Sequence, residues 1–325
     1  MSDFVIETDR LTKFYGQKCA VDQVSLTVPR GSVYALMGRN GSGKTTTIRM
    51  LLGLVTPTRG TASVLGRSSL DLTPDVRSRI GYLSESHYVY RWMKIAECAK
   101  FQQSTFARWN QTIFDAVVDH FGLDRKTKAG ALSRGERAGL CLAMTLGTDP
   151  DLLILDDPAL GLDPVARRSL VEAMLAVTSH NERTILFSSH LLDDVERVAD
   201  HVGIIDQGVL RVQTSVDDFR ERICQWRLTF ETLPSALPAL TGLVHTEYLD
   251  NEIRVTIANS NDETEATLRS LNPRQMEKCG VGLERAVIDY LTTRGRSGSL
   301  LQAVGAVRST DESPQQIAAV SEQTI

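Results

Sequence analysis

The chain has 325 residues, and its 36 Lys and Arg against 40 Asp and Glu give a formal net charge of −4. This length exceeds one average domain and predicts two. Because basic and acidic residues are interspersed without long blocks, the charge pattern argues against a nucleic-acid-binding surface.

The cysteines and the N-terminus indicate the compartment. Five cysteines lie far apart, without a CxxC pair or a Cys/His cluster, so we expect buried thiols in a reducing cytosol rather than disulfides or zinc ligands. The first residues, MSDFVIETDR, lack the basic and then apolar pattern of a signal peptide. No segment approaches the ~18 apolar residues that span a bilayer. We therefore expect a cytoplasmic protein, and one that serves a membrane must do so through a partner.

The first two thirds of the sequence predict an α/β domain. Residues 4–28 have the pattern of short strands around a turn, and a strand at 33–37 leads into an apolar helix at 46–54. Residues 93–122 have a helical pattern. Strand and helix signals then alternate: strand 152–155, a helix after Pro164, strand 184–189, helix 191–200 and strand 202–206. This alternation predicts a mostly parallel sheet covered on both faces, with a helical insertion at about 86–147.

The pattern changes after residue 208. Strand signals at 227–232 and 252–258 are followed by a closing helix at 284–293. We therefore expect a first domain over residues 1–214 and a small α+β domain over 215–295. Residues 296–325 are rich in Ser, Gly, Gln and Thr and short of large apolar residues, which predicts a disordered tail.

The segment GRNGSGKT at residues 38–45 matches GxxxxGK followed by Ser or Thr, in the strand, loop and helix order that this motif requires. Glycines let successive N–H groups face phosphates, and the helix N-terminus adds its positive dipole. Lys44 is expected to reach the β and γ phosphates and Thr45 to ligate Mg²⁺. GTPases, kinases and motors share this loop, so other residues must decide among them. The expected nucleotide-binding residues are Gly38, Arg39, Asn40, Gly41, Ser42, Gly43, Lys44, Thr45 and Thr46.

Three further motifs distinguish between the classes of protein that share the phosphate loop. LSRGE stands at residues 132–136 at the head of a helix, LLILDD ends a buried strand with Asp156 and Asp157, and His190 follows the strand 184–189. With the phosphate loop and Tyr15, the sequence over residues 5–212 resembles the ATP-binding subunit of an ABC transporter. The resemblance implies a P-loop NTPase cassette with antiparallel and helical subdomains, ATP and Mg²⁺ as ligands, and two subunits that enclose two nucleotides.

The resemblance also implies roles for single residues. Tyr15 stacks on adenine, Asp156 holds Mg²⁺ with Thr45, Asp157 activates the attacking water, and His190 senses the γ phosphate. The signature residues contact the ATP of the opposite subunit, and residues 160–163 form an interface loop. The signature comprises Leu132, Ser133, Arg134, Gly135 and Glu136, and the loop includes Gly161, Leu162 and Asp163.

Three departures from the family pattern affect these roles. Glu85 stands where the family has Gln; it can still ligate Mg²⁺ or turn toward solvent. Arg134 and Glu136 replace Gly and Gln in the signature; S-x-x-E predicts a capping box, and Arg134 either adds a cation to the opposite site or lies in solvent. Asp157 replaces Glu, which shortens its reach by on the order of 1 Å and predicts a slow ATPase.

The leading hypothesis is an ATPase subunit that drives export through separate transmembrane permease subunits. The alternative is a nucleotide-gated regulatory subunit that hydrolyses little ATP, and a soluble non-transport ABC ATPase is a lesser alternative. Partners are the permease and a second ATPase subunit, in a homodimer or a heterodimer, with no nucleic acid.

Overall fold

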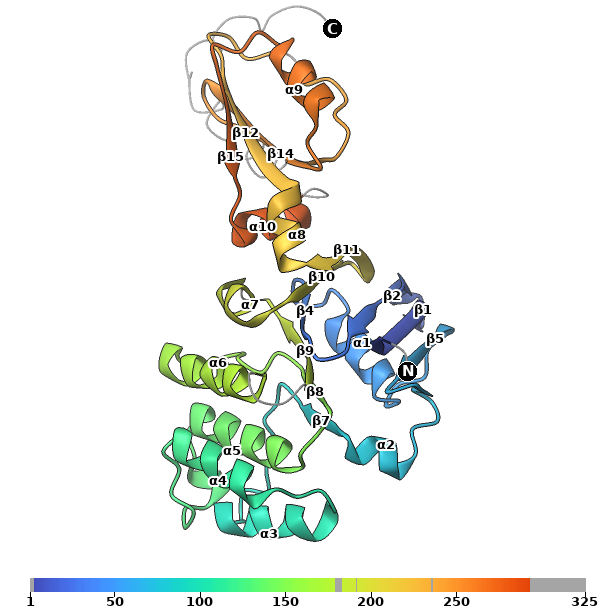
Figure 1. Ribbon diagram of the computed structural model, residues 1–325, viewed down its shortest axis with the longest axis vertical. Coiled ribbons are helices and arrows are strands. Elements are labelled where there is room, and N and C mark those ends of the chain that lie inside the picture. Colours follow the sequence, from blue (N-terminus) through green and yellow to red (C-terminus); the bar gives the residue numbers. More distant parts are fainter. Residues whose placement is uncertain (1–2, 179–182, 191, 235, 293–325) are drawn as a thin grey trace, which may run out of the picture.

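The computed structural model describes residues 3–178, 183–190, 192–234 and 236–292 (Figure 1). The tail expected over 296–325 lies outside the described residues. Within them the strands form three sheets, two that lie before residue 216 and one that lies after it. The predicted α/β fold class is confirmed.

The central sheet has six strands in the order β11-β10-β4-β9-β8-β7. Neighbours are parallel from β10 to β7, and β11 pairs antiparallel with β10. Because the parallel strands end at the same edge, the loops that follow β4, β7, β8 and β9 meet there. The strands are β4 (Val33–Met37), β7 (Ile80–Leu83), β8 (Leu152–Leu155), β9 (Thr184–Ser189), β10 (His201–Asp206) and β11 (Val209–Ser215).

Both faces of this sheet are buried, in two separate hydrophobic clusters. Side chains alternate along a strand, so Val33, Ala35 and Met37 of β4 lie in one cluster, whereas Tyr34 and Leu36 lie in the other. The first cluster contains the helical segments, and the second contains the antiparallel strands and the helix that follows β4. Continuous apolar strands such as LLIL are typical of this two-sided burial.

An antiparallel sheet covers the second face. The strand β1 (Phe4–Tyr15) pairs with β2 (Lys18–Val24), β3 (Thr27–Pro29) and β5 (Arg59–Val64), and β5 pairs with β6 (Arg67–Ser68). Helix α1 (Lys44–Leu51) packs against β5 and β2. It begins two residues before the helix expected at 46–54 and ends three residues earlier, because Gly53 turns the chain with φ 68°.

The helical insertion is not one helix. The pattern over 93–122 forms α3 (Ile95–Thr105) and α4 (Gln111–His120), separated where the Asn110 side chain caps α4 by accepting from the Ile113 N–H at 3.2 Å. A short 3-10 turn, η1 (Ala129–Ala131), leads to α5 (Arg134–Gly147), which packs along α4. A short helix α2 (Pro74–Ser78) precedes β7.

Two helices alternate with the strands of the second half. Helix α6 (Pro164–Thr178) follows β8, and α7 (Leu192–Val198) follows β9. The first residue of the helix expected at 191–200 lies outside the described residues. Among the helices in the described ranges, none is both long and apolar enough to cross a membrane.

The last part of the chain forms a four-stranded antiparallel sheet in the order β13-β14-β12-β15. The strand expected at 252–258 is observed as β14, whereas the one expected at 227–232 starts four residues earlier, because β12 follows α8 without a turn. Sequence analysis missed α8, β13, α9 and β15. The elements are α8 (Val216–Arg222), β12 (Ile223–Thr229), β13 (Leu243–Tyr248), β14 (Glu252–Ala258), α9 (Asp262–Arg269), β15 (Gln275–Gly280) and α10 (Leu283–Thr292).

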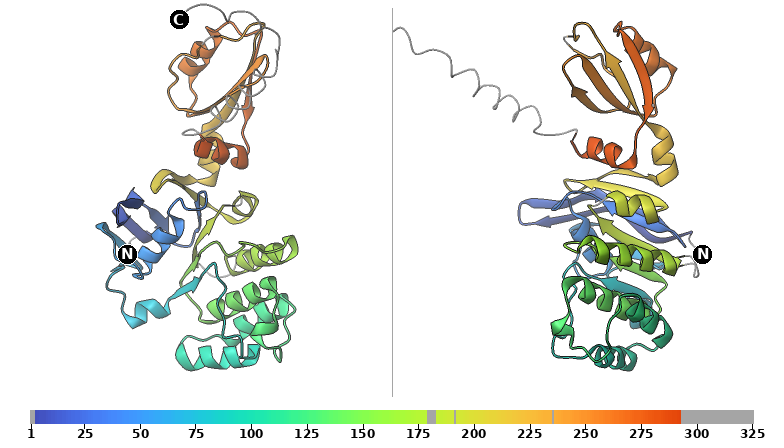
Figure 2. Two further views of the ribbon diagram at one scale, coloured as in Figure 1. Left: turned by 180° about the vertical axis from the view of Figure 1, so that it is seen from behind. Right: turned by 90° about the vertical axis from the view of Figure 1, so that its left-hand side faces the viewer.

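Helix α10 returns from this small sheet to the nucleotide-binding part of the chain. Its Ala286 and Val287 are buried in the same cluster as Val198 of α7 and Phe219 of α8. Figures 1 and 2 show α8 and α10 between the four-stranded sheet at one end of the molecule and the six-stranded sheet. The closing helix expected at 284–293 is therefore a link between the two sheets.

Candidate functional site

The phosphate loop lies between β4 and α1 at the C-terminal edge of the six-stranded sheet. Gly41 and Gly43 have φ of 80° and 112°, which side chains other than glycine rarely adopt. At Gly43 a Cβ would also lie 2.6 Å from the Ala20 carbonyl oxygen. Ser42 Oγ is buried without a hydrogen-bond partner among the described residues. The loop thus has the tight turn and the spare polar group that a phosphate ligand requires.

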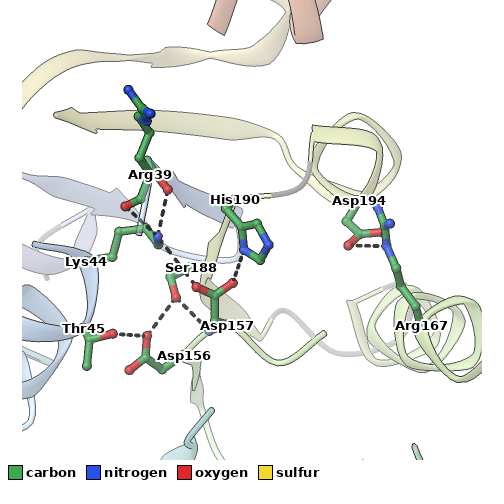
Figure 3. Close-up of polar contacts among 10 residues, drawn as sticks. Arg39, Lys44, Thr45, Asp156, Asp157, Arg167, Ser188, His190 and Asp194 are labelled. Atoms are coloured by element: carbon green, nitrogen blue, oxygen red, sulfur yellow. Dashed lines mark hydrogen bonds and ion pairs between the residues drawn. The ribbon is translucent and has the colours of Figure 1, made fainter. Parts of the chain in front are cut away.

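Lys44 lies at the centre of the site and is 4% exposed. Its Nζ donates to the Gly38 carbonyl at 2.8 Å and lies 3.6 Å from Asp157 Oδ2 (Figure 3). Burial lowers the pKa of Lys44, and the nearby carboxylates of Asp157 and Asp156 oppose that shift. A buried ammonium of this kind is stabilised by a further anion such as phosphate.

Asp156 forms a small hydroxyl and carboxylate cluster with residues from two other elements. Its Oδ1 accepts from Thr45 Oγ1 at 3.0 Å and from Ser188 Oγ at 2.9 Å (Figure 3). Burial raises the pKa of the Asp156 carboxyl, although both hydroxyl donors favour its charged form. Sequence analysis missed Ser188, which lies near the C-terminal end of β9, the strand next to β8, and belongs to no recognisable motif.

Asp157 is held on both its backbone and its side chain. Its N–H donates to Ser188 Oγ at 2.8 Å, and its Oδ1 lies 2.9 Å from His190 Nδ1, while Oδ2 faces Lys44. Its φ of 46° is in the left-handed region, where an Asp stores backbone strain that the surrounding contacts must offset. The two adjacent acids therefore have different partners: hydroxyls for Asp156, and a lysine and a histidine for Asp157.

A cavity of about 460 Å³ opens above these groups, within the size range of small-molecule sites. It brings together the aromatic residue, most of the phosphate loop and two of the carboxylates that the sequence singled out. Lys18 and Ala20, which were not predicted, and Leu160, which was expected in the interface loop, also line it. The predicted lining residues are Tyr15, Asn40, Gly41, Gly43, Lys44, Thr45, Thr46, Glu85 and Asp157.

Tyr15 and Glu85 mark two sides of the cavity. Tyr15 is the last residue of β1 and is 49% exposed, with Lys13 Nζ 5.2 Å from its ring centroid. An exposed aromatic face of this kind is available for stacking on a base. Glu85 is exposed and follows β7, so its carboxylate is free to face either the cavity or solvent.

The signature residues Leu132 to Glu136 are not among the residues that line this cavity. The predicted capping box is confirmed: Ser133 Oγ accepts from the Glu136 N–H at 3.2 Å, and Glu136 Oε2 accepts from the Ser133 N–H at 2.8 Å. Gly135 packs so closely on Ala166 of α6 that a Cβ would lie 2.6 Å from the Ala166 Cβ. A single chain therefore does not bring its own signature to its own phosphate loop.

Arg134 is exposed to solvent, which is one of the two arrangements expected from the sequence, but its guanidinium also has a partner in its own chain. Its guanidinium packs over Gly161, where the φ of 68° and the close guanidinium both exclude a side chain. Asp163, two residues on, caps α6 by accepting from the Val165 and Ala166 N–H groups. The expected interface loop is thus packed on one side against the signature helix of the same chain.

The oxygen cluster fits a hard divalent cation. Mg²⁺ prefers carboxylate and hydroxyl oxygens and retains several waters, so one carboxylate, one hydroxyl and nucleotide phosphates are sufficient. Thr45 Oγ1 and Asp156 Oδ1 are such a pair, and a cation would also offset the buried negative charge. A phosphate loop at a helix N-terminus, a buried lysine and this acid pair define a nucleotide-binding P-loop ATPase domain.

Comparisons with known proteins place this domain in a family. The ABC transporter family model matches residues 21–160. Bacitracin transport ATP-binding protein BcrA of Bacillus licheniformis is 36% identical over 220 residues, 67% of this chain and 72% of that protein. Daunorubicin/doxorubicin resistance ATP-binding protein DrrA of Streptomyces peucetius is 32% identical over 294 residues, 87% and 86% of the two chains. A solved ATP-binding subunit of an ABC transporter is 27% identical, with TM-score 0.60, over 67% of this chain and 92% of that chain.

The chain belongs to the ABC transporter family as an ATP-binding subunit. The predicted cassette fold, ATP binding and ATPase activity are confirmed at the level of the family.

Proposed function

We propose that this subunit hydrolyses Mg²⁺-ATP to drive export through separate transmembrane permease subunits, from the inner face of the membrane. The observation that carries the proposal is the pairing of Asp156 with Thr45 and of Asp157 with Lys44 and His190 beside one cavity. The names of the relatives, bacitracin transport and daunorubicin/doxorubicin resistance, support an export role and make antibiotics the first cargo to test.

Thr45 and Asp156 would hold the Mg²⁺, and Glu85 stands on the same cavity as a third oxygen ligand. Bound Mg²⁺ would neutralise charge on the β and γ phosphates. Lys44 would exchange its contacts with Gly38 and Asp157 for phosphate oxygens, and Tyr15 would stack on adenine. The loop N–H groups would provide the remaining phosphate contacts.

Asp157 would orient and deprotonate the attacking water, with His190 holding the carboxylate through Oδ1. Because Oδ2 faces Lys44 at 3.6 Å, nucleotide binding frees that oxygen as the lysine turns to phosphate. The shorter side chain of Asp then limits the rate. A slow but active site is the expected result.

The opposite subunit would provide the signature to each ATP. Ser133 and Gly135 would contact the γ phosphate across a dimer, with Gly161 to Asp163 at the interface. The separation of this signature from the cavity of its own chain supports that arrangement. Residues 1–214 would form the ATP-binding domain, with the helical subdomain at about 86–147, and residues 215–295 an accessory domain linked through α10.

The permease would contact the surface between β7, α3 and α5. Tyr88 and Trp92 there are 78% and 68% exposed, beside Tyr90 and Phe101, which are also exposed. The ring centroid of Tyr90 lies 6.2 Å from that of Trp92 and 6.0 Å from that of Phe101, so the three rings form one patch. A cavity of about 210 Å³ between Tyr82, Gln102 and Met144 adjoins it. A large exposed apolar patch is typical of a binding site.

The test is reconstitution of the chain with permease subunits encoded beside it, in sealed vesicles. ATP-dependent movement of an antibiotic that is lost in Lys44→Ala supports the proposal. If ATP is hydrolysed but no antibiotic is transported with any permease that co-purifies, the proposed export function is contradicted.

One observation favours the second candidate, a nucleotide-gated subunit with little hydrolysis. Asp157 is already occupied by Lys44 and His190 and is one methylene shorter than Glu. ATP turnover per site in the assembled transporter separates the two functions, because a motor must turn over in step with transport.

A further inference from the structure

A four-residue turn connects the nucleotide cavity to the aromatic surface. After β7 ends, the His87 N–H donates to the Ser84 carbonyl at 3.2 Å, and His87 has the left-handed φ of 45°. Glu85, inside the turn, lines the nucleotide cavity, whereas His87 lines the cavities beside Tyr88 and Trp92. Two residues of one short turn therefore face two different sites.

The His87 ring is buried in the protein rather than exposed on this surface. It is 3% exposed, and its Nε2 lies 3.0 Å from the Pro158 carbonyl oxygen. A carbonyl oxygen only accepts, so Nε2 carries the proton and donates. Burial lowers the pKa of His87 and outweighs the hydrogen bond to Pro158, which raises it; Arg134 and Arg137 lower the pKa further, so the neutral ring is favoured.

Pro158 immediately follows Asp157, so the hydrogen bond from His87 to the Pro158 carbonyl holds the backbone next to Asp157. The Asp157 backbone is bonded at its N–H by Ser188 Oγ and at its carbonyl by the Leu160 N–H at 3.0 Å. His87 holds the next carbonyl. Because the φ of 46° at Asp157 is strained, contacts on both sides are needed to keep its carboxylate between Lys44 and His190.

We propose that His87 is a positioning residue that fixes the Asp157 carboxylate through Pro158 and links it to the permease-facing aromatic surface. The link to the permease rests on the proposed function; the effect on Asp157 needs only the ATPase activity of the family. Displacement of Tyr88 or Trp92 by a bound permease moves the neighbouring turn, and the His87 hydrogen bond transmits that movement to the residue beside the acid.

The alternative is a buried histidine that contributes only to stability, and two variants distinguish them. His87→Gln keeps a side-chain N–H donor, whereas His87→Leu keeps bulk and loses the donor. In the isolated chain we expect His87→Leu to lower kcat about tenfold with KM for ATP within about twofold, since small displacements of a catalytic group cost this much. His87→Gln should recover at least half of the lost rate.

His120→Leu is the matched control. The His120 Nε2 also contacts a carbonyl, that of Ser169, at 2.9 Å, but between α4 and α6. The kcat of His120→Leu should stay within about twofold of wild type. The melting temperature of every variant is measured beside its kcat. Equal loss of kcat in His87→Leu and His87→Gln, or loss that only follows the melting temperature, overturns the positioning role.

The assembled transporter tests the link to the permease. Wild-type ATP turnover should change when the permease binds, and His87→Leu should remove most of that change while the permease still co-purifies. An unchanged response in His87→Leu overturns the link. If no permease alters the wild-type rate, the link and the proposed export function are both contradicted, whereas the kcat comparison in the isolated chain still decides the positioning role.

Discussion

At the residue scale, neighbouring carboxylates acquire different partners through strand alternation and a backbone bend. Leu152 and Ile154 of β8 face the cluster around α1, and Asp156 continues that alternation to meet Thr45. Asp157 then leaves the strand with φ of 46°, which directs its carboxylate to Lys44 and His190. The geometry of both acids therefore follows from the position at which the strand ends.

Lengthening Asp157 tests the reach of this acid. We expect Asp157→Glu to raise steady-state ATP turnover, because misplacement of a catalytic group by on the order of 1 Å can cost ~10²-fold in rate. We expect Asp157→Asn to lower turnover ~10²-fold or more, because an amide cannot accept the proton of the attacking water. ATP affinity measured by calorimetry should stay similar in both, as Lys44 and the loop bind the phosphates. If the Glu variant is no faster than wild type, reach does not limit the rate.

Asp156 carries a stability cost for its function. Its raised pKa means that the folded state binds the proton more tightly, so this carboxyl lowers stability as pH rises above its usual pKa of 3.8. Asp156→Asn keeps an acceptor for Thr45 and Ser188 without the charge. At pH 7 we expect the nucleotide-free variant to be more stable by about 0.5–2 kcal/mol and to lose Mg²⁺-dependent turnover. Lower stability in urea unfolding would contradict this.

At the element scale, helix α5 depends on its N-terminal capping box. We expect Glu136→Ala to lower the free energy of unfolding by about 0.5–1 kcal/mol and Glu136→Gln to preserve it, since Gln also completes the box. Thermal unfolding measures both effects. A Gln variant of normal stability but with turnover reduced more than about tenfold would instead assign Glu136 a role at the opposite ATP.

Helix α10 is anchored to the small sheet by a buried charge. Asp289 is 1% exposed, accepts from Thr256 Oγ1 and lies 3.0 Å from Arg285 Nε. Asp289→Ala removes the acceptor of the buried Thr256 hydroxyl, whereas Arg285 is partly exposed and keeps its contact with Glu247, so the variant should cost about 1–3 kcal/mol. Glu265→Ala, which breaks an exposed pair with Arg269 on α9, is the control and should cost under about 0.5 kcal/mol. Equal effects in denaturant unfolding would contradict the anchor.

At the scale of the whole molecule, the separation of the signature from the cavity is consistent with the proposed second subunit. Most of the phosphate loop, Glu85 and Asp157 line the cavity, whereas the signature residues do not. With Asp157→Asn to slow hydrolysis, we expect light scattering to show monomers without nucleotide and dimers with Mg²⁺-ATP, and EDTA to prevent the dimer. If the chain stays monomeric by itself under all conditions and dimerises only when a second ATPase subunit is added, the assembly is a heterodimer.

Much of the fold was predictable because its signals are local. The glycine loop at 38–45 and the apolar strands 33–37, 152–155 and 184–189 depend on backbone geometry and two-sided burial, which short patterns encode. The small sheet was harder: β13 and β15 are edge strands with mixed polar residues, and their pairing with β14 and β12 depends on distant sequence. Ser188 was missed because a single hydroxyl in a strand has no distinguishing pattern.

The sequence by itself determined the cassette, the order of its motifs, the capping box and the identity of both acids, since each is a property of a few consecutive residues. Only the tertiary structure decided which groups meet: Asp157 with Lys44, Arg134 on Gly161, His87 on the Pro158 carbonyl and α10 against α7. These contacts join segments far apart in the chain, and packing rather than local propensity selects them.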